Sequence, residues 1–158
     1  MKYLVSLFLA TCALSLCSRG QDLRNQLPES YVALLRSEIQ VQKTDIVQQN
    51  IILSEDHAKK FWPLQRSYEN DLSKLGDQRL NIIRDYVKNW DHLNNETARN
   101  LGKQLLDYQK KCVGLRSKYF ERISKEVSPK IAVKFFQIEI PLEDFIDLEI
   151  ASSVPLIK

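Results

Sequence analysis

The chain is poor in the residues that break or cross-link a fold. Its 158 residues include four glycines, five prolines and three cysteines. It has no Asn-Gly or Asp-Gly pair, the strongest short hairpin signal. In the long segments between the glycines and prolines, apolar residues recur at the helical period rather than at every second position. We therefore expect an all-α chain.

Residues that carry chemistry are equally sparse. His57 and His92 are the two histidines, and neither belongs to an H-x-x-H or H-E-x-x-H pattern. The sequence contains no nucleophile elbow, no phosphate-binding glycine loop and no zinc-ligand spacing. We expect a protein that is not an enzyme, with no cofactor, no metal site and no catalytic residue.

Residues 1–20 have the pattern of a secretory signal peptide. Lys2 is followed by an apolar run from Tyr3 to Cys17, which is shorter than the roughly 20 residues that span a bilayer. We expect cleavage after Gly20, with cleavage after Ser15 as the alternative. Cleavage before Cys12, which would give a lipid-anchored protein, is a weaker alternative. The remaining chain would be exported.

Removal of this segment changes the charge and cysteine counts. It takes away Lys2 and Arg19 and leaves 21 basic residues against 20 acidic ones. So small a net charge gives no bias toward nucleic acid, and we expect no nucleic-acid partner. Cys112 is then the remaining cysteine, so an internal disulfide is excluded. Its place on an apolar stripe predicts a small buried side chain.

One short phrase recurs three times, as "LSEDHA" from residue 53, "LNNETA" from residue 93 and "VSPKIA" from residue 127. In each copy an apolar residue precedes a residue that caps helix N-termini, and an alanine follows one turn later. We interpret the phrase as three helix starts, that is, as repeated architecture rather than a repeated chemical site. The motif residues are Leu53, Ser54, His57, Leu93, Asn94, Thr97 and Ser128.

The first two starts open long apolar stripes with steps of three and four residues. They predict helices from Glu55 to about Trp90 and from Asn95 to about Glu126. Because the link is short, the two helices should form an antiparallel hairpin. Pro63 should bend the first of them.

Two further helices complete the prediction. Residues 21–52 should form an N-terminal helix, from Pro28 to about Thr44, and a linker. Residues 53–158 should form the hairpin and a C-terminal helix that opens at Pro129, all within one domain. Pro141 should bend or break that last helix. The last helix is acidic and the second hairpin helix is basic, so either they lie together or both present solvated mixed faces.

Two segments resemble a known family. "LSEDHA" and "LNNETA" are similar to the paired Leu-Thr-x-x-Gln motifs of the Spy/CpxP-like periplasmic proteins. Leu53 and Leu93 match the Leu, and Ser54 replaces the Thr. Asn94, His57 and Thr97 depart from the motif. The resemblance covers residues 53–150.

The resemblance implies a small helical protein of the bacterial envelope. Some members hold unfolded clients on a concave helical surface without ATP, and others are stress-sensing or metal-sensing accessory proteins. We therefore expect a non-enzymatic periplasmic binding protein with a chaperone-like or envelope-stress-response role. The alternative is a metal- or stress-responsive accessory protein of a two-component sensor system.

The expected partners follow from the same resemblance. They are unfolded or envelope proteins, or a sensor protein, with a homodimer as a further option. Two adjacent aromatic pairs, Phe61-Trp62 and Phe135-Phe136, would place one ring of each pair away from the seam, because neighbouring residues point to different helix faces. Trp62 and Phe136 are the candidate client-binding side chains, with Phe61 in the seam.

Overall fold

A computed structural model describes the chain from residue 29 to residue 153. This part contains four α-helices, which are α2 (Glu29–Asn50), α3 (Glu55–Asn89), α4 (Asn95–Glu126) and α5 (Pro129–Ser153). A 3₁₀ turn, η1 (Trp90–His92), joins α3 to α4. No strand occurs in the described range, and the all-α prediction is confirmed. The signal peptide expected at residues 1–20 lies outside the described residues.

The chain divides into two units, residues 1–37 and residues 38–158. The described part of the first unit is the opening of α2, at residues 29–37. The second unit holds the rest of α2 together with α3, α4 and α5. All packing described below lies within this second unit.

All three copies of the recurring phrase are helix starts in the structure. The Ser54 hydroxyl accepts a hydrogen bond from the His57 N–H (3.3 Å), and the Asn94 side chain accepts one from the Thr97 N–H (2.8 Å). The Ser128 hydroxyl accepts one from the N–H three residues on, at 3.2 Å. These bonds satisfy backbone donors that the first turn of a helix leaves free. The phrase therefore fixes where α3, α4 and α5 begin.

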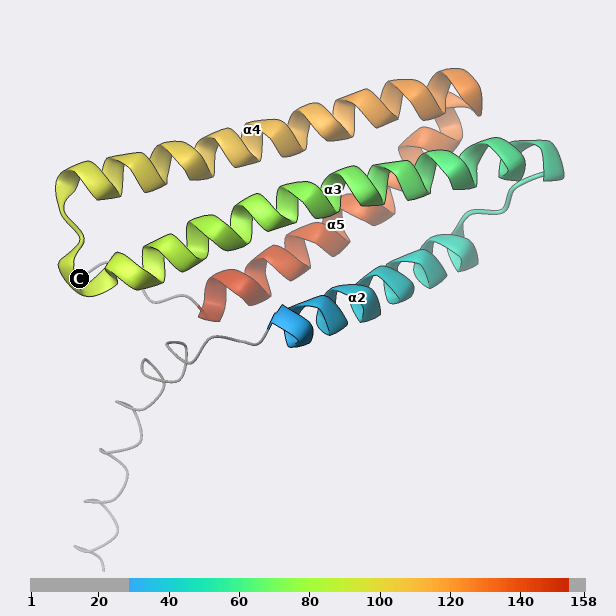
Figure 1. The fold of residues 1–158 in the computed structure, drawn as a ribbon. Helices are drawn as coiled ribbons and strands as arrows, with labels where there is room; N and C mark the ends of the chain where they lie inside the picture. The colour runs from blue at the N-terminus through green and yellow to red at the C-terminus, as the bar shows by residue number, and fades with distance from the viewer. Residues whose placement is uncertain (1–28, 154–158) are drawn as a thin grey trace, which may run out of the picture. The chain divides into compact units, whose positions relative to one another are not determined.

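Helices α3 and α4 form the predicted antiparallel hairpin (Figure 1). Helix α5 packs along α4. With 35 residues, α3 is about 52 Å long at 1.5 Å per residue. The sequence placed the end of the first helix at Thr44, whereas α2 continues to Asn50. The burial of Val47 explains the added residues, because it gives this polar stretch one apolar contact with the core.

Neither internal proline ends its helix. α3 is continuous through Pro63, and α5 is continuous through Pro141 to Ser153. Both prolines are exposed, as are Lys59 and Gln137, whose carbonyl groups lose a helical donor to the missing N–H. Water can satisfy those carbonyls, so the helices tolerate the two prolines.

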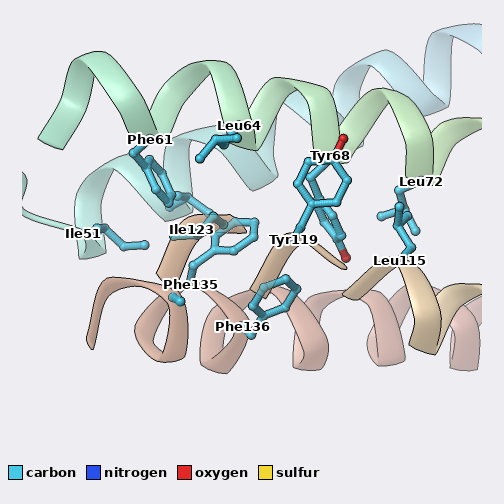
Figure 2. Close-up of a cluster of buried hydrophobic side chains, with 12 residues drawn as sticks. Ile51, Phe61, Leu64, Tyr68, Leu72, Leu115, Tyr119, Ile123, Phe135 and Phe136 are labelled. Atoms are coloured by element: carbon cyan, nitrogen blue, oxygen red, sulfur yellow. The ribbon is translucent and has the colours of Figure 1, made fainter. Parts of the chain in front are cut away.

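Aromatic side chains dominate the core (Figure 2). Tyr68 of α3 lies edge-on to Tyr119 of α4, with ring centroids 5.4 Å apart, and edge-on to Phe135 of α5 at 5.6 Å. Phe61 is fully buried and lies edge-on to Phe135 at 5.6 Å, as its predicted place in the seam requires. Such edge-on pairs add stability beyond the burial of their area.

The core occupies one end of the hairpin. In α3 every buried side chain lies between Phe61 and Leu72, and no side chain is buried in η1. On the α4 side the core takes Leu115, Tyr119 and Ile123, which come late in that helix. Nearer the turn, α4 buries Leu101, Tyr108 and Cys112 outside the main cluster. Cys112 is a free thiol and 8% exposed.

Candidate functional site

Three helices bring charged side chains into the core at one level. Lys43 of α2, Glu69 of α3 and Glu139 of α5 are 4%, 6% and 0% exposed. Each lies three or four residues from a buried apolar side chain of its own helix: Val47, Leu72 and Phe135. Helical periodicity therefore turns all three charges toward the interior.

Lys43 connects these carboxylates. Its Nζ atom donates to Glu139 Oε1 at 2.8 Å, to Glu69 Oε2 at 3.2 Å and to Glu143 Oε1 at 2.5 Å. An ammonium group has three N–H donors, and each carboxylate takes one of them. We name Lys43, Glu69, Glu139 and Glu143 the Lys43 cluster.

Two buried oxygens next to the cluster have no hydrogen-bond partner. They are Glu139 Oε2 and the hydroxyl oxygen of Tyr68. Burial raises the pKa of the Tyr68 phenol, and the negative charge of Glu139 adds to that effect. An unpaired oxygen in a buried site carries the full cost of its lost hydration. A charge on Glu139 is therefore poorly compensated.

The charges of the cluster do not balance. One ammonium faces three carboxylates, so the cluster carries two net negative charges when all three are ionised. Burial raises the pKa of Glu139 to about 7, and the attraction of Lys43 offsets only part of that effect. Burial also raises the pKa of Glu69. Burial alone would lower the pKa of Lys43, but the three carboxylates outweigh it and raise that pKa.

The cluster can therefore join three helices and bind a proton near neutral pH. Sequence reasoning missed it, although one sign was present. Glu139 lies four residues after Phe135 on the apolar stripe of the last helix. A charged residue on such a stripe needs a buried partner. The sequence pattern does not show that Lys43, 96 residues away, supplies it.

The two aromatic residues expected at the surface have different surroundings. Phe136 is 7% exposed, with its ring centroid 5.6 Å from that of Tyr68 and 6.2 Å from that of Phe120. The expectation of an exposed Phe136 is wrong, because α5 has neighbours on two of its faces. Trp62 is half-buried and packs against Phe61 at 5.0 Å, so only part of its ring is accessible.

Large exposed apolar side chains occur elsewhere. Leu106 and Val113 of α4 are 66% and 59% exposed and lie seven residues apart, which places them on one face of the helix. Lys103 and Lys110 are exposed beside them in the sequence. We name Leu106 and Val113 the α4 stripe. On α5 the corresponding exposed side chains are Val133, Ile140, Phe145 and Leu148.

Three acidic residues of α5, Glu139, Glu143 and Asp147, pair with basic residues of α2 and α3. Beside the bonds of Lys43, Arg79 of α3 forms an ion pair with the carboxylate of Asp147 and donates to its backbone carbonyl at 3.3 Å. α5 does lie along α4, as one of the two sequence interpretations proposed. Within residues 29–153, α5 forms ion pairs with Lys43 of α2 and with Arg79 of α3, and neither of these two partners belongs to α4.

Comparison of the chain with protein-family models, with curated proteins and with solved structures finds no match. The resemblance to the Spy/CpxP-like proteins therefore stays a prediction. Within residues 29–153 no helix is long and apolar enough to cross a membrane. In the same range no three His, Cys, Asp or Glu side chains are grouped so as to hold a metal ion.

Proposed function

We propose that this protein is a non-enzymatic helical binding protein with a chaperone-like role in the bacterial envelope, where it holds unfolded or partly folded proteins. The observation that carries the proposal is the α4 stripe, where Leu106 and Val113 are more than half exposed. A long helical face of this kind offers apolar contact to a chain that has not buried its own apolar residues. Such binding needs no nucleotide.

The surroundings of the stripe suit a client that binds loosely. Lys103 and Lys110 add positive charge beside the apolar side chains and favour segments that combine apolar and acidic residues. The apolar side chains of the stripe are separated by charged and polar ones, so no large continuous patch forms. The resemblance of the helix starts to the Spy/CpxP-like motif supports the same role.

An aggregation assay tests this proposal. Purified protein should suppress the aggregation of an unfolded test protein at near-stoichiometric ratio without nucleotide. The double variant Leu106→Ser/Val113→Ser should weaken this protection several-fold with helicity and melting temperature nearly unchanged, because both side chains are exposed. Ile52→Ser is the matched control, since Ile52 is an apolar side chain that is 92% exposed outside α4.

Two results would count against the proposal. If the wild type gives no protection with several test proteins and salt concentrations, the chaperone-like role is wrong. If the double variant protects as well as the wild type and Ile52→Ser, the client surface is not the α4 stripe. Phe145→Ser/Leu148→Ser would then test the exposed face of α5.

The second candidate is a stress-responsive accessory protein of a two-component sensor system. The Lys43 cluster favours it, because the pKa of Glu139 lies at about 7 and its charge changes with modest changes of pH. This candidate predicts that deletion of the protein alters a sensor-controlled reporter when the external pH shifts. It also predicts direct binding of the protein to the sensor, which a chaperone-like protein that acts on its clients alone does not require.

A further inference from the structure

Residues 39–50 of α2 are attached to the rest of the second unit by two buried side chains, Lys43 and Val47. Of these two side chains, Val47 is apolar and Lys43 is charged. One of the two α2 anchors is thus a charged residue that bonds to α3 and α5. An element with so little apolar burial is the one expected to open first.

We propose that residues 38–50 of α2 form a pH-controlled cover over the core, with the Lys43 cluster as its catch. At mildly acidic pH the Lys43 cluster keeps residues 38–50 packed against the core, and this attachment weakens as pH rises through neutrality. Opening uncovers the Lys43 cluster and the adjoining edge of the core, where Val47 now packs. That edge is an apolar surface for the same unfolded clients, and this last step alone rests on the proposed function.

The charges around Glu139 explain the catch. It faces Lys43 of α2, Glu69 and Tyr68 of α3, and Glu143 of its own helix, and Arg116 of α4 acts on Tyr68. When Glu139 is protonated, one ammonium is shared by two carboxylates. When Glu139 ionises, the same ammonium is shared by three, and Glu139 Oε2 holds charge without a donor. The added repulsion falls on the residues that retain α2.

The direction of the pH effect follows from the raised pKa values. Glu139 and Glu69 bind protons more tightly in the closed form than in an open, solvated form. Their contribution to closure is fully present below the ordinary pKa of a glutamate. It is lost as pH rises through the closed-form value of Glu139, about 7. An exposed salt bridge does the opposite, because it weakens on acidification.

Hydrogen exchange of the full chain, measured between pH 5.5 and pH 8 and corrected for the intrinsic exchange rate, tests the proposal. The opening constant of residues 38–50 should rise by about 10–100-fold over this range, since one proton gives at most about tenfold per pH unit. The amides of α4 near Tyr119 should show no comparable change. In Glu139→Gln the amide keeps the shape without the charge, so α2 should stay protected and the pH slope should fall well below that of the wild type, to the part that Glu69 contributes.

Controls make each outcome decisive. Glu121→Gln changes an exposed glutamate of α4 and should keep the wild-type slope. Lys43→Met removes the ammonium that offsets the carboxylates, so residues 38–50 should be less protected than in the wild type at pH 8, while the helicity of α3 and α4 is retained. A flat wild-type profile, protection that increases with pH, or an unchanged slope in Glu139→Gln overturns the catch. Wild-type protection of residues 38–50 at pH 8 in Lys43→Met also overturns it, and this result tests the catch even if Glu139→Gln does not fold.

A client assay at both pH values separates the two steps. Protection of an unfolded test protein should be greater at pH 8 than at pH 5.5, and Glu139→Gln should reduce that difference. If α2 opens with pH but protection does not change, the catch stands and the client step is wrong. If protection is absent at both pH values, the proposed function fails, while the exchange result still decides the catch.

Discussion

At the scale of single residues, Phe61 and Trp62 show how one step along a helix changes the environment. Phe61 is fully buried between Trp62 and Phe135, whereas Trp62 is half-buried at the edge of the same cluster. The stripe of the sequence predicted the burial of Phe61, because its steps of three and four define the face that meets α4. The stripe did not predict the burial of Phe136.

Phe136 and the Lys43 cluster mark the limit of that reasoning. A periodic pattern assigns one buried face to a helix. α5 has two, because Phe136 contacts Tyr68 of α3 and Phe120 of α4. The partners of Lys43 lie 26, 96 and 100 residues away along the chain. Only the packing of three helices brings these charges together, so a single stripe cannot reveal them.

The first residue-scale prediction is that Phe61→Ala lowers the free energy of unfolding by about 3–5 kcal/mol, because it leaves a cavity between aromatic rings. Leu106→Ala should change it by no more than about 0.5 kcal/mol, since that side chain is mostly exposed. Urea unfolding followed by circular dichroism measures both. Similar losses for the two variants would contradict the placement of the core.

At the scale of elements, the helix starts are what the sequence predicted best. α3 and α4 begin at Glu55 and Asn95, as the two caps indicated. These ends are determined locally, by side-chain oxygens that accept bonds from the first turn. The end of α2 is not determined locally, because it depends on the burial of Val47 in a core built by other helices. This is why the predicted end fell six residues too early.

The element-scale prediction concerns the two glycines of α4. A Cβ atom added at Gly102 or Gly114 would meet nothing within 4 Å. Alanine has the higher helix propensity, so Gly102→Ala and Gly114→Ala should each stabilise the protein by about 0.5–1 kcal/mol. Thermal unfolding of the single and double variants measures this. A loss of stability at either position would show that this face of α4 is covered in solution, for instance by a second copy of the chain.

At the scale of the whole molecule, two groups of carboxylates act in opposite directions. Glu139 and Glu69 have raised pKa values, so the native state loses stability as pH rises above the ordinary range of glutamate. Asp71 accepts hydrogen bonds from Tyr119, Lys74 and Lys118, and these lower its pKa. Its contribution is present above the ordinary range of aspartate and is lost below it. The molecule therefore contains carboxylates whose pKa values are raised and others whose pKa values are lowered.

The whole-molecule prediction is a stability maximum on the acid side of neutrality. The free energy of unfolding should fall between pH 5.5 and pH 8 by no more than about 1.4 kcal/mol per pH unit for each proton lost. It should also fall below pH 4, as Asp71 and the remaining carboxylates are protonated. Urea unfolding at constant ionic strength from pH 3.5 to pH 8.5 measures the profile. A maximum above pH 7 would rule out a dominant role for Glu139.

The position of the core at one end of the hairpin has a practical consequence for spectroscopy. The sequence contains two tryptophans, and α3 places them near its two ends, with Trp62 against Phe61 and Trp90 at the C-cap. They are separated by about 42 Å at 1.5 Å per residue. Because burial in α3 stops at Leu72, one indole reports on the packed end and the other on the lightly packed end. Two single-tryptophan variants thus turn intrinsic fluorescence into separate optical probes of the two ends of one molecule.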